Sequence, residues 1–192
     1  VRVHGHIVVL GGQWCDGGMM TQILKVTSEG GRAGLGRLVA DGRVIACALG
    51  PAGIRADKRE GDGATPEGCF VLRRVLYRAD RLAAPVTGLP VVALAPDDGW
   101  SDDPADRRYN CPVSLPHGYR HERLWREDQV YDIIVVLGHN DAPPAAGQGS
   151  AVFFHLAHAD YRPTAGCVAV SRTDMLALLA GLQPGAVMAI SR

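Results

Sequence analysis

The sequence predicts one mainly β domain, with mixed β-sheets in a sandwich-like arrangement, one clear helix and a long irregular loop. The chain has 192 residues, the length of a single ordinary domain. It contains 24 Gly and 12 Pro, a content that suits many tight turns. Short apolar runs bounded by such turn residues recur along the chain, as in a β-rich domain.

The charges exclude several classes of function. Lys and Arg number 20, as do Asp and Glu, so the formal net charge is zero. That balance argues against a nucleic-acid-binding protein and against a polybasic protein of the membrane surface. No apolar run approaches the roughly 18 residues that span a bilayer. We therefore expect a globular domain with no nucleic-acid partner and no membrane span.

The expected strands are short and separated by turn residues. The run at 131–137 is continuously apolar and β-branched, which predicts a central strand. The glycine-rich stretch at 31–36 is predicted to be a connection. Taken in chain order, strands are expected at 22–27, 43–49, 69–77, 89–95, 131–137, 151–156, 167–170 and 186–190.

Two further segments have distinct signals. Ser171 is a predicted N-cap for a helix over 172–182, because its hydroxyl can accept from the N–H of Asp174. Residues 96–129 are polar and irregular, and a loop of that size in a compact domain is usually a lid or a substrate wall. Residues 1–20 are expected to be a disordered extension of a 21–192 domain, with too short an apolar segment for a signal peptide.

Cysteine usage indicates neither a zinc ribbon nor a redox pair. The five cysteines form no CxxC motif, and an odd number leaves at least one unpaired. Cys47 and Cys69 lie in apolar runs, which predicts that both act as small buried hydrophobic residues. Cys167 has a different neighbourhood.

The segment around Cys167 has the residues of acyl transfer. A thiol nucleophile needs a base, a cationic neighbour to hold the thiolate and N–H groups aimed at the developing oxyanion. Gly166 allows the sharp turn that presents such groups. His155, at the end of a predicted strand twelve residues upstream, would be brought beside the thiol by a second strand.

Two alternatives to this pair are open from the residues alone. His158 competes with His155 for the role of base. A zinc site of His155, His158 and Cys167 is conceivable, although the spacing matches no familiar zinc pattern. The GRAGLG run at 31–36 lacks the strand-to-helix context and the Lys of a phosphate loop. We expect no cofactor and no bound metal.

Three motifs in order resemble the L,D-transpeptidase (YkuD) family. The run Thr164-Ala165-Gly166-Cys167-Val168 is similar to its nucleophile signature, usually Ser/Thr-x-Gly-Cys-Ile/Val. The run at 149–155, GSAVFFH, resembles the strand that ends in the family's catalytic His. The turn at 58–68 contains GDGATPEG, where many members read GDxxTPxG. The resemblance extends over most of the chain, from about residue 58 to 190.

The resemblance implies a fold and a chemistry. The fold would be a mainly β domain with the active site in a groove. Cys167 would attack a peptidoglycan stem-peptide carbonyl to form a thioester, with His155 as general base and later acid. The acyl group would pass to a diaminopimelate amine. Backbone N–H groups around Gly166 and Cys167 would stabilise the oxyanion, and Thr164 would shape the turn.

The sequence departs from the common family pattern at two positions. Many members have His before the Gly-Cys and Arg two residues after the Cys, where this chain has Ala165 and Ala169. Arg162 or Arg126 could supply the missing cation, and either could equally be a solvated surface charge. The chain has no LysM module, which indicates a compact single-domain branch.

Three aromatic residues of the long loop have two open interpretations. Tyr109, Trp100 and Trp125 could line a groove for a stem peptide, or could pack under the loop. Some members of a branch like this make 1,3 cross-links in place of 3,3 cross-links, and the residues near Cys167 do not distinguish the two.

Alternative functions share the same fold. Water as acceptor would make the protein an L,D-carboxypeptidase, or an amidase that releases proteins attached to the wall. A non-catalytic cell-wall binding module is the alternative of another class. The resemblance implies a periplasmic or cell-wall location, peptidoglycan stem peptides as donor and acceptor, a monomer, and acylation by carbapenems.

Overall fold

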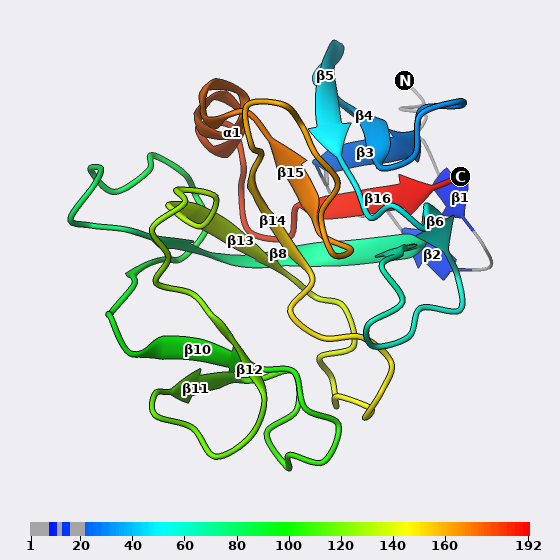
Figure 1. Ribbon diagram of the computed structural model, residues 1–192. Helices are drawn as coiled ribbons and strands as arrows, with labels where there is room; N and C mark the ends of the chain where they lie inside the picture. Colours follow the sequence, from blue (N-terminus) through cyan, green and yellow to red (C-terminus); the bar gives the residue numbers. More distant parts are fainter. Residues whose placement is uncertain (1–7, 11–12, 16–21) are drawn as a thin grey trace.

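The computed structural model describes residues 8–10, 13–15 and 22–192 (Figure 1). Two short strands, β1 (Val8–Leu10) and β2 (Gln13–Cys15), pair antiparallel. They lie within the 1–20 segment for which the sequence predicts a disordered extension. The other residues of that segment lie outside the described part of the chain.

The main sheet closes on itself. β13 pairs with β14 on one side and with β8 on the other, which joins the two ends of the strand order into an eight-stranded ring. A further strand, β9 (Val91–Ala93), adds to β8 outside the ring. In spatial order the ring consists of β13 (Ile133–Leu137), β14 (Phe153–Leu156), β15 (Val168–Val170), β5 (Arg43–Ala48), β4 (Leu35–Ala40), β3 (Ile23–Ser28), β16 (Val187–Ser191) and β8 (Gly68–Tyr77).

The central position predicted for the 131–137 run is confirmed, and its two faces enter different cores. Ile133, Val135 and Leu137 belong to the main core together with residues from the other ring strands. Ile134 and Val136 point the other way into a second apolar cluster. Because successive side chains of a strand alternate between faces, a strand that is apolar throughout requires burial on both sides.

The long segment after β9 contains regular secondary structure, where the sequence predicts an irregular loop. It forms a three-stranded antiparallel sheet in the order β11 (Pro112–Ser114), β10 (Asp98–Ser101), β12 (His121–Arg123). Figure 1 shows this small sheet below β8 and β13. Its strands have only three or four residues, too few for alternation to be recognised in the sequence.

A second correction concerns β4, which the sequence analysis did not predict. The strand begins at Leu35, inside the glycine-rich stretch that we interpreted as a connection, and pairs with both β3 and β5. Gly36 tolerates no side chain there, because an added Cβ would lie 2.6 Å from Thr27 O. The glycine therefore allows close packing within the sheet.

The helix begins as predicted and ends earlier. Helix α1 covers Arg172–Leu179, and the Ser171 hydroxyl accepts from the Asp174 N–H at 3.1 Å. Met175, Leu178 and Leu179 pack into the main core. Residues 180–182, which we expected to be helical, turn toward β16 instead.

Two other short strands, β6 (Ile54–Arg55) and β7 (Thr65–Pro66), pair parallel and frame the 58–68 turn. The turn forms one wall of the pocket described below.

The cysteines differ in their state. Cys47 is a fully buried free thiol, as predicted. Cys69 is disulfide-bonded and only half-buried, so its interpretation as a small buried hydrophobic residue was wrong.

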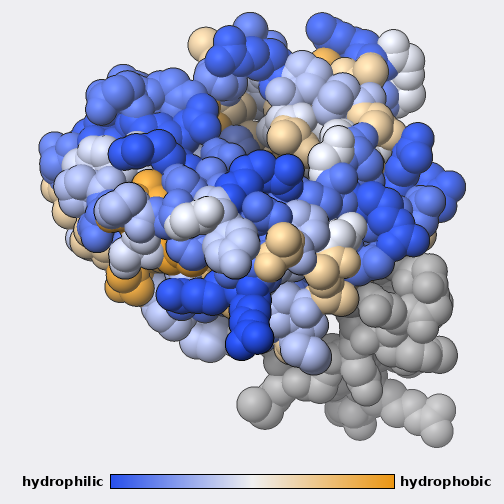
Figure 2. All heavy atoms as spheres, turned by 60° about the horizontal axis from the view of Figure 1, so that its bottom comes forward, coloured by the Kyte–Doolittle hydropathy of each residue, from blue (hydrophilic) through white to orange (hydrophobic). Residues whose placement is uncertain are grey.

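The outer surface is predominantly polar. Figure 2 shows hydrophilic residues over most of the face on the side of the β10–β12 sheet. Large exposed apolar side chains are dispersed over different elements: Val44, Val86, Val92, Tyr119 and Leu176. In the described part of the chain, no helix has the length and apolar character needed to cross a membrane.

Candidate active site

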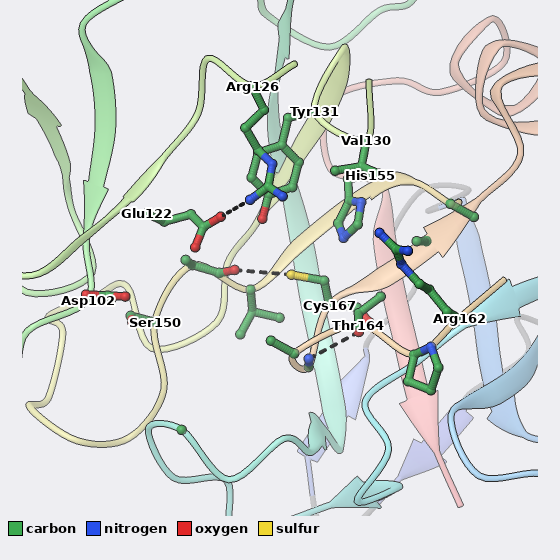
Figure 3. Close-up of a pocket in the computed structure, with 18 of the residues that line it drawn as sticks. Asp102, Glu122, Arg126, Val130, Tyr131, Ser150, His155, Arg162, Thr164 and Cys167 are labelled. Carbon is green, nitrogen blue, oxygen red and sulfur yellow. Dashed lines mark hydrogen bonds and ion pairs between the residues drawn. The ribbon is translucent and has the colours of Figure 1, made fainter. Parts of the chain in front are cut away.

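Two neighbouring parallel strands place Cys167 and His155 on one face of the ring. β14 pairs with β15 in a register that sets His155 opposite Ala169. Phe153 and Cys167 both belong to the second apolar cluster, while Phe154 and Val168 belong to the main core. Alternation then puts His155 on the same outer face as Cys167, two residues along from Phe153. Both residues line one pocket, about 330 Å³ in volume (Figure 3).

The Cys167 thiol is neutral in this arrangement. Its Sγ donates to Ala151 O at 3.3 Å and accepts from the Phe153 N–H at 3.3 Å. Burial raises the pKa of the thiol to about 12, and the Phe153 N–H only partly opposes that effect. The structure thus has a protonated thiol at the candidate nucleophile, not the stabilised thiolate expected from the sequence.

His155 is held in one tautomer. Its Nδ1 lies 2.9 Å from Leu156 O, and a carbonyl oxygen can only accept, so Nδ1 bears the proton. The other ring nitrogen, Nε2, therefore has a free lone pair. Burial lowers the pKa of His155 to about 4, so the imidazole is neutral at physiological pH and available as a base.

The turn before the nucleophile is built around Thr164. Its Oγ1 donates to Cys167 O at 2.7 Å and accepts from the Gly166 N–H at 3.1 Å. Gly166 has φ +138°, and an added Cβ would lie 2.6 Å from Ala64 O. Only glycine fits this position without displacing the backbone. Because the Gly166 N–H is already bonded to Thr164, the Cys167 N–H is the better candidate for an oxyanion donor.

Tyr131 and Glu122 are pocket residues that sequence reasoning missed. The Tyr131 ring meets His155 edge-on, with centroids 5.1 Å apart, and the Arg126 guanidinium lies 5.0 Å from the Tyr131 ring centroid. Arg126 is paired with Glu122 at 3.0 Å and with Asp128 at 2.6 Å. The Arg126–Asp128 spacing was visible in the sequence, but the stacking on Tyr131 depends on the fold.

The two arginines proposed as substitutes for the missing cation have different partners. Both line the pocket. Arg126 is neutralised by two carboxylates, as described above. Arg162 donates to His158 Nε2 at 2.9 Å, and none of the ion pairs in the described residues includes it. Arg162 therefore has a positive charge that a substrate carboxylate could use, and His158 is its hydrogen-bond acceptor.

Two aromatic residues proposed for substrate binding do not line the pocket. Trp100 is 5% exposed and packs edge-on against Phe153, with centroids 5.2 Å apart. Tyr109 is 4% exposed, and its hydroxyl donates to Glu60. The third loop aromatic, Trp125, packs under the Arg78 guanidinium. These residues support the walls of the site from below.

Asn110 connects the long segment to the loop that leads into β14. Its Oδ1 accepts from Trp100 Nε1 at 2.9 Å and from the Ala151 N–H at 3.1 Å. Its Nδ2 donates to His139 O and Asn140 O at 3.0 and 2.8 Å. The side chain is buried, and one of these four contacts holds the N–H of Ala151, whose carbonyl accepts the hydrogen bond of the Cys167 thiol.

Lys58 supplies a cation close to the turn before Cys167. Its side chain is buried and passes close to Gly166, from which an added Cβ would be 3.6 Å from Lys58 Cε. The ammonium pairs with Asp62 at 2.5 Å. Its charge favours the ionised form of Cys167, but less than burial opposes it. We had placed Lys58 at the start of a turn motif without assigning it a role.

The charges of the pocket are separated. Figure 3 shows Cys167 with Arg162 on one side and with Asp102, Glu122 and Ser150 on the other. The described residues contain no group of three or more His, Cys, Asp or Glu side chains that could hold a metal ion. The pocket thus combines a neutral thiol with a neutral imidazole whose Nε2 is free, and it has polar groups on both sides. This arrangement is suited to nucleophilic acyl transfer.

The comparison with known families covers nearly the whole chain. The model described as the L,D-transpeptidase catalytic domain (YkuD) matches residues 23–190. That match includes every element of the ring, the 58–68 turn and the Cys167 segment. No curated protein matches the chain.

Proposed function

The chain belongs to the L,D-transpeptidase (YkuD) catalytic-domain family, and on that premise we propose that it cross-links peptidoglycan with Cys167 as nucleophile and His155 as base. The observation that carries the proposal is the placement of a buried thiol and an Nδ1-protonated imidazole on one face of two neighbouring strands, lining one pocket. That tautomer directs a lone pair, not a proton, into the site.

The first half of the reaction is acylation. Cys167 Sγ attacks a stem-peptide carbonyl carbon while His155 Nε2 takes the thiol proton, so no thiolate needs to accumulate beforehand. The Cys167 N–H stabilises the oxyanion. The bond to the leaving amine then breaks as His155 returns the proton to that amine, and a thioester remains.

The second half transfers the acyl group to a diaminopimelate amine, which forms a 1,3 or a 3,3 cross-link according to which carbonyl the donor pocket accepts. The unneutralised charge of Arg162 supports a role in holding a donor carboxylate. The substrate assigns the working site to the periplasm or the cell-wall space. One chain supplies every residue of this mechanism, in accord with a monomer.

The test is mass spectrometry of purified muropeptides incubated with the protein and with its Cys167→Ala variant. We expect dimers with the intact protein and none with the variant, and fragmentation identifies the 1,3 or 3,3 bond. Shortened or released monomers without dimers would make the protein a hydrolase. No change in either sample would favour a non-catalytic wall-binding module. Circular dichroism of the variant controls for its folding.

A further inference from the structure

Glu60 is a pocket carboxylate held by two hydroxyl groups. Its Oε2 accepts from the Tyr109 hydroxyl at 2.5 Å and from the Ser150 hydroxyl at 2.6 Å. Its backbone is fixed as well, because the Glu60 N–H donates to Gly147 O at 2.9 Å. Tyr109 lies in the long segment and Ser150 in the loop before β14, so two distant parts of the chain fix one carboxylate.

The charge of Glu60 is not neutralised by a cation. Two cations that line the pocket have other carboxylate partners, Lys58 with Asp62 and Arg126 with Glu122. The third, Arg162, is bonded to His158. A third pocket carboxylate, Asp102, is paired with Arg120 at 2.9 Å. Among the described residues Glu60 forms no ion pair, and its Oε1 has no hydrogen-bond partner. Hydroxyl donors stabilise a carboxylate without cancelling its charge.

The two hydroxyl donors are themselves fixed. Tyr109 is buried, and burial together with Glu60 holds the pKa of its phenol above the usual range, so it remains a donor at any working pH. Ser150 precedes Ala151, whose carbonyl oxygen accepts from the Cys167 thiol. Glu60 is therefore positioned relative to the nucleophile through a short stretch of backbone.

Glu60 is held on the side of the pocket away from Arg162, the residue proposed to bind the donor. Ser150, its partner, lies on the opposite side of Cys167 from Arg162 (Figure 3). A ligand with a carboxylate and a ligand with an ammonium group would thus be drawn to opposite sides of the same thiol. A cross-linking reaction needs two such substrates.

We propose that Glu60 binds the ammonium group of the acceptor stem peptide and so selects a cationic amine as the acceptor. This inference rests on the proposed function. Tyr109 and Ser150 are positioning residues that keep the Glu60 carboxylate at the acceptor side of Cys167.

The acceptor step balances with the residues present. The acceptor binds as an ammonium ion and loses one proton to His155, while Glu60 continues to accept from a remaining N–H. The nitrogen lone pair forms the new C–N bond, the C–S bond of the thioester breaks, and the sulfur leaves with the electron pair. Of the two protons that the nitrogen loses, one returns to Cys167 Sγ and one passes through His155 to solvent.

The experiment separates the two halves of the reaction. Thioester formation is followed by intact mass with a donor peptide alone, and transfer is then followed at increasing concentrations of an acceptor with a free diaminopimelate amine. Glu60→Gln keeps an oxygen for both hydroxyl donors and removes the charge. It should form the thioester at the normal rate and raise the KM for the acceptor about 10- to 100-fold, the value of a lost charged hydrogen bond.

Two further variants keep the test informative. Asp102→Asn removes a pocket carboxylate that is already paired with Arg120, and should leave the KM for the acceptor within about twofold, since an exposed pair contributes little. Tyr109→Phe keeps the Glu60 charge but removes one of the two hydroxyl groups that hydrogen-bond to it. It should raise the KM for the acceptor by a smaller factor without changing the rate of acylation.

Hydroxylamine, a nucleophile that is mostly uncharged at neutral pH, gives a charge-specific readout. It should cleave the thioester of Glu60→Gln as fast as that of the intact protein. An unchanged acceptor KM in a Glu60→Gln variant that forms the thioester would overturn the inference. Equal losses with hydroxylamine and with the peptide acceptor would also overturn it. Failure of the unmodified protein to form a thioester would instead overturn the proposed function.

Discussion

The Cys167 thiol donates its hydrogen bond to the backbone carbonyl of Ala151, 3.3 Å away, and not to His155. Ala151 has φ +49° and its N–H is held by Asn110, so this carbonyl is fixed in place. In this structure Cys167 is thus a thiol hydrogen-bonded to a backbone acceptor. The proton has to change partner to His155 when a substrate carbonyl approaches.

Replacement of the two candidate bases should have very different effects. His155→Ala removes the Nε2 lone pair of the imidazole that lines the same pocket as the thiol, and should reduce the acylation rate about 10²- to 10⁴-fold, the usual contribution of a general base. His158→Ala should be mild, because His158 accepts from Arg162 and its Nε2 is occupied. Intact mass after incubation with a carbapenem measures the acylation of Cys167. The reverse order of effects would assign the base to His158.

The acylation rate should be insensitive to pH over most of the neutral range. Burial lowers the pKa of His155 to about 4 and raises that of Cys167 to about 12, so both groups keep their working protonation state between these values. Acylation should decline only as the pH falls toward 4, when His155 binds a proton. Alkylation by iodoacetamide, measured at Cys167 by peptide mass spectrometry because Cys47 and Cys111 are also free, should be slow at pH 7. A decline centred near pH 6.5 would contradict the buried state of His155.

The stability should depend on His155 in the same acid range. Its pKa is about 4 in the folded protein and 6.5 in the unfolded chain, so the unfolded chain binds more protons between these values. The stabilisation is present above pH 6.5 and is lost as the pH falls toward 4, by about 3 kcal/mol in total. The free energy of unfolding, measured in urea at several pH values, should therefore fall more steeply between pH 6.5 and 4 for the protein than for His155→Gln. Parallel curves would refute this linkage.

The two pocket arginines should affect different kinetic constants. Arg162→Gln removes a charge that no described carboxylate neutralises and should raise the KM for the donor about tenfold with little change in kcat. Arg126→Gln removes the partner of Glu122 and Asp128 beside Tyr131, and should lower kcat through the position of His155. Steady-state kinetics with a donor peptide measures kcat and KM for both variants. An equal change in KM for the two variants would refute the difference in their roles.

Loss of the Asn110 side chain should disturb the nucleophile without contacting it. Asn110→Ala leaves the N–H groups of Trp100 and Ala151 without their acceptor, at a cost of about 2–4 kcal/mol in the free energy of unfolding. Acylation should slow as the Ala151 carbonyl is freed. Asn110→Asp keeps the acceptor oxygen but sets a second oxygen against His139 O and Asn140 O, so it should recover only the part of both losses that belongs to the shared acceptor, in thermal unfolding and in carbapenem acylation. No difference between the two variants would contradict the role of the shared acceptor.

Local sequence information determined much of the fold. The helix start at Ser171 needs only a hydroxyl and the N–H three residues on, so the sequence contains all that is required. The strand at Ile133–Leu137 was predictable because a short β-branched run that is apolar throughout is typical of a strand buried on both faces. β4 and the strands of the long segment were missed, since a short strand is stabilised by its partners more than by its own residues.

The motifs likewise predicted a nucleophile and a base without the structure, since the family pattern has glycine, cysteine and histidine at fixed positions of the turn and strand. The tertiary structure decided everything that depends on distant pairs. Glu60 is 49 residues from Tyr109 and 90 from Ser150, separations over which no periodicity exists. Burial, which makes Cys167 a neutral thiol and His155 a neutral base, arises only when the long segment covers the sheet. The sequence by itself specified the candidate reactive groups, and the packing decided their charge, their tautomer and their neighbours.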